Sequence, residues 1–253
     1  MIPVFSLFTF LIGAILGSFL NVLIDRLPRQ KTVLFGRSRC ESCHRILAAR
    51  DLIPIISYLA LSGHCRYCHA KIPQRLLVVE IASGILASSL FLYTTYMNLP
   101  PLIFIPLLII MLSFLGIFFA DMTYGVIPDE FIVAIIGSSL FLLILENNAL
   151  IVNHFFAGVG SFLLFLVLHI ITRGRGMGFG DVKLALALGL FLGFPLIIVG
   201  LYAAFLTGSL VSLILVAMGL KKMRGGTIAF GPFLSIGAFV GYFFGTKIIN
   251  FFL

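Results

Sequence analysis

Charged side chains are scarce in this 253-residue chain, where Asp, Glu, Lys and Arg together make up 10% of the residues and hydrophobic types make up 61%. A water-soluble globular domain needs more charge than this to cover its surface. A membrane-spanning helix needs about 20 mostly apolar residues to cross ~30 Å of hydrocarbon. Several uncharged stretches of the chain reach that length. The composition therefore predicts an all-α polytopic membrane protein.

The apolar runs predict about eight transmembrane helices. We place them at residues 2–24, 76–97, 101–120, 127–146, 150–172, 181–193, 195–219 and 227–252. Residues 184–220 form one uncharged run, which must fold back at Gly193, Phe194 and Pro195 to supply two helices, so the sixth helix is short. The first run has no preceding basic residue and no small-residue cleavage site, so we interpret it as a retained helix.

The basic residues are unevenly distributed, and ten of the 17 Lys and Arg lie from Arg26 to Arg75. Cytoplasmic loops near membrane ends carry an excess of basic residues, so this segment is predicted to face the cytoplasm. Alternation of sides then places a second set inside as well: Arg173, Arg175, Lys221, Lys222 and Arg224. Membrane orientation thus accounts for the net charge of +8, and we expect no nucleic-acid partner.

All four cysteines lie in the polar segment 25–75, as two CxxC pairs separated by 21 residues: Cys40, Cys43, Cys65 and Cys68. This spacing is typical of structural four-thiolate zinc sites, and disulfides are disfavoured in a reducing cytoplasm. A loop of this size has too little apolar content for a core of its own, so a metal ion would stabilise its fold. Redox-active or free thiols are the alternative, and three histidines are substitute ligands: His44, His64 and His69.

Acidic residues are few, and ionisable groups in or beside a membrane are costly unless they are paired or solvated. Each is therefore a functional candidate. Asp121 ends the third predicted helix, and Asp181 opens the sixth. Both are predicted at the cytoplasmic side, and they can meet only if those two helices are neighbours. Glu80, about one turn into the second helix, is expected to pair with a basic loop residue.

Two neighbouring carboxylates tend to share one proton, which suits peptide hydrolysis. The ionised carboxylate takes a proton from water, while the protonated one donates to the scissile carbonyl. Gly178 and Gly180 would let an extended peptide approach Asp181 closely. The alternatives are a proton relay and simple helix capping, which also applies to Asp129 after Pro128.

The other polar residues of the predicted helices rank lower. His154 and His169 are expected to be hydrogen-bonded bundle residues, and Ser18 and Asn21 to hydrogen-bond between helices. The sequence contains no serine-nucleophile motif, no phosphate-binding loop and no glycine-rich dinucleotide fingerprint. Residues 52–61 form a short apolar element interrupted at Pro54, which we expect on the metal module or at the membrane interface.

Segments along nearly the whole chain together resemble the bacterial type IV prepilin peptidases. They are Gly17–Val22 with Arg26-Leu27-Pro28, Ser38-Arg39-Cys40 with Cys43, Ile53–Tyr58, Gly63–Cys68, Glu80, Asp121 with Ile127-Pro128-Asp129, Met177–Leu184 and Phe230–Leu234. Each motif is weak alone, but their order and spacing are specific. The resemblance implies that Asp121 and Asp181 are the catalytic pair of a GxGD membrane aspartyl protease in the bacterial inner membrane.

The resemblance further implies a prepilin, or a pilin-like subunit of a secretion or competence apparatus, as substrate. Many members also methylate the new N-terminus with S-adenosyl-L-methionine, and the four-cysteine loop is associated with these members. The implied parts are the first helix at 1–24, the cytoplasmic zinc loop and candidate methyltransferase part at 25–75, and the protease bundle at 76–253. Residues expected to contact substrate or support the pair are Gly178, Gly180, Lys183, Asp129 and Glu80.

Two other functions stay open from the residues. One is a peptidase without methylation, in which the zinc loop is only structural. The other is a proton-coupled transporter, in which Asp121 and Asp181 relay protons. A transporter predicts sites near the middle of the membrane and often internal repeats, and the sequence shows no convincing repeat.

Overall fold

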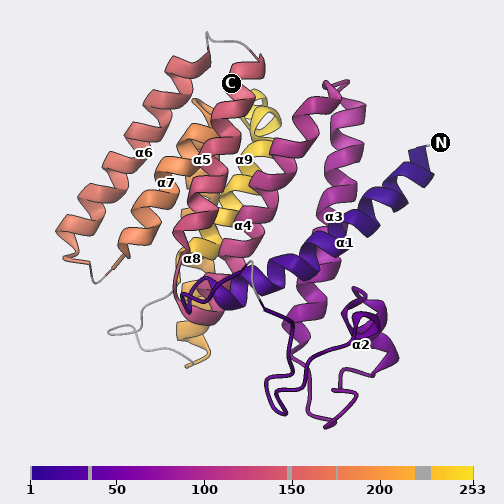
Figure 1. The fold of residues 1–253 in the computed structure, drawn as a ribbon. Coiled ribbons are helices and arrows are strands. Elements are labelled where there is room, and N and C mark those ends of the chain that lie inside the picture. The colour runs from indigo at the N-terminus through magenta and orange to yellow at the C-terminus, as the bar shows by residue number, and fades with distance from the viewer. Residues whose placement is uncertain (1, 34–35, 147–149, 175, 220–228, 253) are drawn as a thin grey trace. The chain divides into compact units, whose positions relative to one another are not determined.

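The computed structural model describes residues 2–33, 36–146, 150–174, 176–219 and 229–252 (Figure 1). Nearly all regular structure in these residues is helical, as predicted. Two isolated β-bridges join Arg39 to Ile46 and His64 to Lys71. The chain forms two compact units, Met1–Leu108 and Ile109–Leu253.

The first unit consists of two long helices joined by the polar loop. Its elements are α1 (Ile2–Arg26), the 3₁₀ helix η1 (Ala49–Leu52), the short helix α2 (Ile56–Ala60), α3 (Gln74–Tyr96) and η2 (Pro101–Ile103). α1 packs against α3. Asn21 on α1 donates a hydrogen bond to the carbonyl of Leu76 on α3 at 3.0 Å, which confirms the expected bond between helices.

The second unit is a helical bundle that contains most of α4 (Phe104–Tyr124). The helices that follow are α5 (Asp129–Glu146), α6 (Ile151–Ile171), α7 (Phe179–Leu192), α8 (Leu196–Ala217) and α9 (Gly231–Phe252). α7 contacts α5, α6, α8 and α9. Most of its side chains are buried, so α7 is the interior helix around which the others pack.

Each predicted membrane pass corresponds to one of these long helices, with its ends displaced by a few residues. Six helices of the described chain are long and apolar enough to cross a membrane: α1, α3, α4, α6, α8 and α9. α5 carries three acidic residues in 18 positions, and α7 has only 14 residues. The chain is therefore a multi-pass membrane protein with six candidate spans.

Part of the predicted topology falls outside the described residues. This concerns the connection at 147–149, the start of the last pass at 227, and the basic residues Arg175, Lys221, Lys222 and Arg224. Arg173, by contrast, is described and lies directly after the end of α6.

The predicted reversal at 193–195 is present, and α6 holds it in place. Asn153 on α6 accepts a hydrogen bond from the Phe194 amide at 2.7 Å and donates one to the Phe194 carbonyl at 3.0 Å. His154 bonds to the carbonyl of Leu190 at 2.9 Å. These bonds satisfy backbone groups that the end of α7 leaves unpaired. The short sixth helix therefore ends where the sequence indicated.

Small residues let α6 and α7 approach closely along their length. The Ser161 hydroxyl donates to the carbonyl of Ala185 at 2.8 Å. A Cβ atom at Gly189 would lie 2.5 Å from the carbonyl oxygen of Ala157 and 2.5 Å from the Ser161 hydroxyl oxygen. Only glycine fits at this crossing, as in other tightly packed membrane helices.

We expect Gly189→Ala to destabilise the protein by about 1–3 kcal/mol, because overpacking a tight contact costs this much. Gly160→Ala on α6 is the matched control, because a Cβ atom there meets nothing within 4 Å. Thermal unfolding of the purified protein in detergent measures both variants. An equal midpoint for the two variants would contradict the close α6–α7 packing.

Candidate active site and cysteine cluster

Asp121 lies in the last turn of α4, and its side chain is buried, with 6% of the residue exposed. Its Oδ2 accepts a hydrogen bond at 2.9 Å from the amide of Gly231, the first residue of α9. A Cβ atom at Gly231 would lie 2.7 Å from this same oxygen. Position 231 therefore needs glycine so that the start of α9 can approach the carboxylate.

Asp181 is the third residue of α7 and is equally buried, with 6% exposed. Its Oδ2 accepts a hydrogen bond from the Gly178 amide at 3.0 Å, so the capping role considered from the sequence is present. Capping uses only one oxygen. Oδ1 is buried and has no hydrogen-bond partner among the described residues. A buried acceptor without a partner is uncommon and calls for an explanation, and a substrate or water at this oxygen would supply one.

The two aspartates belong to one site. Ile127, in the turn between α4 and α5, lies close to the segments around both of them. A Cβ atom at Gly180 would lie 3.3 Å from Cβ of Ile127, and one at Gly231 would lie 3.2 Å from its Cδ1. The residue before Asp181 and the amide partner of Asp121 thus contact the same side chain. The carboxylates of Asp121 and Asp181 also interact electrostatically. The bundle therefore brings together two acids that are 60 positions apart in the sequence.

Lys183 and Asp129 form an ion pair beside this site. The Lys183 ammonium lies 2.8 Å from both carboxylate oxygens of Asp129, which links the fifth residue of α7 to the first residue of α5. The pair is partly exposed, so it contributes little stability alone. Its geometry suits a role in fixing where α7 begins.

His169 has a position that the sequence did not reveal. Its Nδ1 lies 2.8 Å from the carbonyl oxygen of Met177, and its ring packs edge-on against Phe179 at 5.9 Å between centroids. The expectation of a hydrogen-bonded bundle residue is correct. However, the partner is the segment that leads into Asp181, so His169 helps to position the catalytic candidate.

The four cysteines form a compact cluster in the first unit. Their Sγ atoms all lie within 4.8 Å of one another, and those of Cys40 and Cys68 are 3.7 Å apart. This separation far exceeds the ~2.05 Å of a disulfide. Four sulfurs at about 2.3 Å from a central ion would be spaced at roughly this distance. The cluster therefore fits a single tetrahedral metal ion.

The two CxxC turns have the same local structure. In each, the first cysteine amide bonds to the carbonyl five residues later, as Cys40 does with Arg45 and Cys65 with Ala70. The residue after the second cysteine, His44 or His69, has a positive φ of 56° or 55°. The repeated turn points backbone amides at the sulfurs, as in structural metal knuckles.

The pKa values of the Cys40 and Cys68 thiols are shifted in opposite directions within the cluster. The amide of Cys43 lowers the pKa of the Cys40 thiol to about 6. Although the amide of Ala70 favours its thiolate, desolvation and the neighbouring sulfurs raise the pKa of Cys68 to about 11. A divalent cation would replace the protons and relieve this repulsion.

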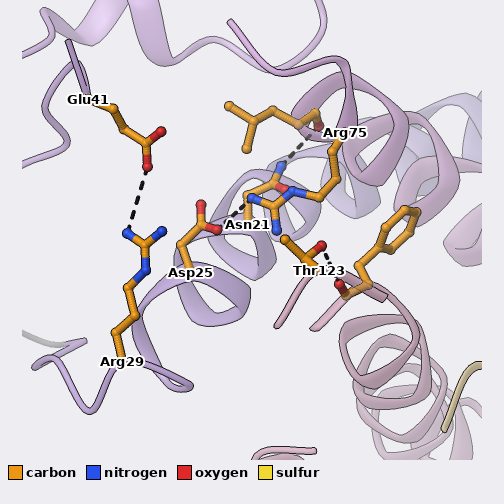
Figure 2. Close-up of polar contacts among 8 residues, drawn as sticks. Asn21, Asp25, Arg29, Glu41, Arg75 and Thr123 are labelled. Atoms are coloured by element: carbon orange, nitrogen blue, oxygen red, sulfur yellow. Dashed lines mark hydrogen bonds and ion pairs between the residues drawn. The ribbon is translucent and has the colours of Figure 1, made fainter. Parts of the chain in front are cut away.

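Polar contacts at the base of the loop join the end of α1 to the start of α3 (Figure 2). Arg75 donates to Asp25 at 2.6 Å, and Arg29 lies 3.8 Å from Glu41.

Glu80 accepts a hydrogen bond at 2.7 Å from the backbone amide of Ile55. The expected pairing of Glu80 with a basic loop residue is therefore wrong, because a loop amide takes that place.

The fold and the paired carboxylates place the chain in the class of multi-pass membrane enzymes. The Bacterial Peptidase A24 N-terminal domain matches residues 11–94, and the Type IV leader peptidase family matches residues 107–213. These two matches meet close to the boundary between the structural units at residue 108. The chain belongs to the type IV leader peptidase family.

Curated relatives named prepilin leader peptidase/N-methyltransferase are similar over nearly the whole chain. The Bacillus subtilis (strain 168) protein is 29% identical over 96% of this chain and 96% of its own length. The Burkholderia pseudomallei (strain 1026b) protein is 28% identical over 94% and 85%, and the Pseudomonas aeruginosa protein is 26% identical over 98% and 93%. No solved structure matches the chain significantly.

We expect purified protein to contain about one zinc ion per chain, and Cys65→Ser to lose most of it, because a structural site needs all four ligands. His64→Ala is the control, because His64 Nδ1 is 2.7 Å from the carbonyl oxygen of Ser62 and is not in the sulfur cluster. Elemental analysis measures the metal content. Full zinc in Cys65→Ser, or its loss in His64→Ala, would contradict the assignment.

Proposed function

We propose that this protein removes the basic leader peptide from prepilins or pilin-like subunits at the cytoplasmic face of the bacterial inner membrane, and methylates the new N-terminus. The observation that supports cleavage most directly is the pair Asp121 and Asp181, both buried in one bundle. The names of the relatives support the substrate and the methyl transfer.

The geometry of the pair supports a two-aspartate hydrolysis. One carboxylate takes a proton from a water molecule, whose oxygen then attacks the scissile carbonyl carbon. The other, protonated, carboxyl donates to the carbonyl oxygen, and the C–N bond breaks as the leaving amine takes a proton. Hydrogen bonds from the backbone amides of Gly231 and Gly178 orient one oxygen of each acid. The second oxygen of Asp181 then stays available for water or substrate.

We further propose eight membrane passes, with α5 and α7 added to the six candidate spans. α7 is interior to the bundle, so neighbouring helices rather than lipid surround its short length. With eight passes, Asp121 near the end of α4 and Asp181 near the start of α7 lie at the same membrane face. The ten basic residues from Arg26 to Arg75 support a cytoplasmic side for that face.

We assign zinc to the four cysteines as a structural ion of the loop 25–75, between the helix at 1–24 and the bundle at 76–253. S-adenosyl-L-methionine would supply the methyl group. The sequence has no glycine-rich nucleotide fingerprint that would mark the residues binding this cofactor. A peptidase without methylation remains the second candidate, because the cysteine cluster is sufficient for a purely structural loop.

The positions of the two acids favour hydrolysis over proton transport. Asp121 is three residues before the end of α4, and Asp181 is the third residue of α7. Both therefore lie near helix ends. Transport sites of broken-helix transporters lie near the middle of the membrane instead.

We expect Asp121→Asn and Asp181→Asn each to reduce leader cleavage by about 100- to 10,000-fold, the usual contribution of a general acid or base. Asparagine retains an oxygen that can accept the amide hydrogen bond, so the fold should persist. Co-expression with a prepilin, followed by mass analysis of the product, measures cleavage. Glu130→Gln is the matched control, because Glu130 is an exposed acid in the first turn of α5. Normal processing by either Asp variant would exclude this mechanism.

We expect Cys40→Ser to retain leader removal and to lose the methyl group, if the loop serves methylation alone. The mass of the mature pilin N-terminus reports both activities in one measurement. Loss of cleavage as well would assign the loop to folding. Normal methylation in a zinc-free variant would contradict a role of the metal module in methyl transfer.

A further inference from the structure

The loop of the first unit exposes an apolar face, which we call the 52–59 face and define as Leu52, Ile53, Ile56 and Leu59. Their exposed fractions are 41%, 45%, 63% and 63%. Ile56 and Leu59 are three positions apart in α2, so they project from the same side of the helix. Four exposed large aliphatic side chains within eight positions indicate an interaction surface that something other than water covers.

The opposite side of the same segment packs on the loop. The Tyr58 hydroxyl donates to the carbonyl of Ile72 at 3.5 Å. A Cβ atom at Gly63 would lie 2.9 Å from that hydroxyl oxygen. α2 therefore has a fixed orientation, with Tyr58 toward the loop and with Ile56 and Leu59 exposed.

Glu80 sets the position of this segment along the axis of α3. Its Oε2 accepts the hydrogen bond from the Ile55 amide at 2.7 Å, and the Ser18 side chain of α1 also bonds to Glu80. Glu80 is six residues after Gln74, where the candidate span begins, which corresponds to about 9 Å along the helix. Ser18 is eight residues before the end of α1, or about 12 Å. The segment is thus tied to the membrane helices inside their spans.

The backbone at Ile55 shows that this attachment overrides local preference. Ile55 has φ 64° and ψ −53°, a conformation that β-branched residues rarely adopt. Such backbone persists only where the surroundings determine it. Here the Glu80 bond and the following turn of α2 hold it. Figure 1 shows α2 beside the start of α3, in agreement with this bond.

The net charge of the loop that carries the 52–59 face favours a lipid surface as its cover. Residues 26–75 contain ten Lys and Arg and two acids, Glu41 and Asp51, giving a net charge of +8 from 10 − 2. Anionic lipid headgroups attract basic segments next to a membrane. Interfacial helices bury their apolar side about 5–10 Å into the boundary between headgroups and acyl chains. With the hydrocarbon taken to begin at the start of the candidate span, a face held at the height of Glu80 along α3 is at this depth.

We propose that the 52–59 face inserts into the headgroup–acyl boundary of the leaflet next to the loop, and so holds the cysteine module against the membrane. The inserted segment does not cross the bilayer. It acts as an interfacial anchor in addition to α1 and α3.

Tryptophan fluorescence tests this directly, because the chain has no tryptophan. Ile56→Trp introduces a single one on the proposed face. Tyr67→Trp is the control, because Tyr67 is an exposed aromatic in the second CxxC turn with the Arg45 guanidinium 5.5 Å from its ring centre. Both full-length variants are reconstituted in phosphatidylcholine–phosphatidylglycerol vesicles with brominated acyl chains.

We expect brominated lipid to quench Ile56→Trp at least about twofold more strongly than Tyr67→Trp, as insertion below the headgroups requires. Acrylamide, which stays in water, should quench Tyr67→Trp more strongly than Ile56→Trp. Equal accessibility of the two variants to acrylamide would place the face in water. Protection of Ile56→Trp from both quenchers would mean that protein covers it. Either result overturns the proposal.

The Glu80 bond provides a second test in the Ile56→Trp background. Glu80→Ala removes the acceptor and should reduce quenching by brominated lipid, whereas Glu80→Gln retains an acceptor oxygen and should preserve it. Zinc content confirms that the cysteine module stays folded in both. Unchanged lipid quenching in a zinc-loaded Glu80→Ala variant would show that Glu80 does not hold the segment at the membrane.

Discussion

The hydrocarbon core of a membrane offers no hydrogen-bond partner, so polar groups within it must be satisfied by the protein itself. This constraint determines how the acids of the helices are used here. Asp121 bonds to the Gly231 amide, Asp181 to the Gly178 amide and Glu80 to the Ile55 amide. The partners of Asp121 and Glu80 belong to other segments, whereas Gly178 is the N-cap of the helix that carries Asp181. Buried acids therefore connect helices to the segments that enter them.

The same constraint explains why α6 contains polar residues that have no chemical role. α7 is short, and both of its ends expose unpaired backbone groups. Asn153 and His154 satisfy groups at the C-terminal end, and Ser161 bonds to a carbonyl in the middle. His169 holds the segment before the N-terminal end. α6 therefore supports the helix that carries Asp181 along its whole length, and this fixed support agrees with the proposed role of that carboxylate.

Much of this arrangement follows from the sequence, because apolar length and scarce charge are local properties. The helix positions, the reversal at 193–195 and the cysteine cluster were all predictable from spacing. Helix capping by Asp181 was considered from the sequence, but the amide partners of Asp121 and Glu80 were not predictable, since a hydrogen bond to a distant backbone amide leaves no residue signature. The partner of Glu80 was mispredicted for this reason. The sequence showed Gly231 only as part of a motif and His169 only as part of a helix. Their roles depend on tertiary contacts.

The nature of each partner also separates the acids by chemistry. Asp129 and Asp25 form ion pairs with Lys183 and Arg75. Asp121 and Asp181 instead accept hydrogen bonds from backbone amides, which orient one oxygen without adding a countercharge. Glu80 has an amide partner as well, but only Asp121 and Asp181 combine this partner with a second carboxylate close enough to interact. Among the described residues, this combination, more than burial, distinguishes the two from the other acids and supports the proposal that they are the reacting pair.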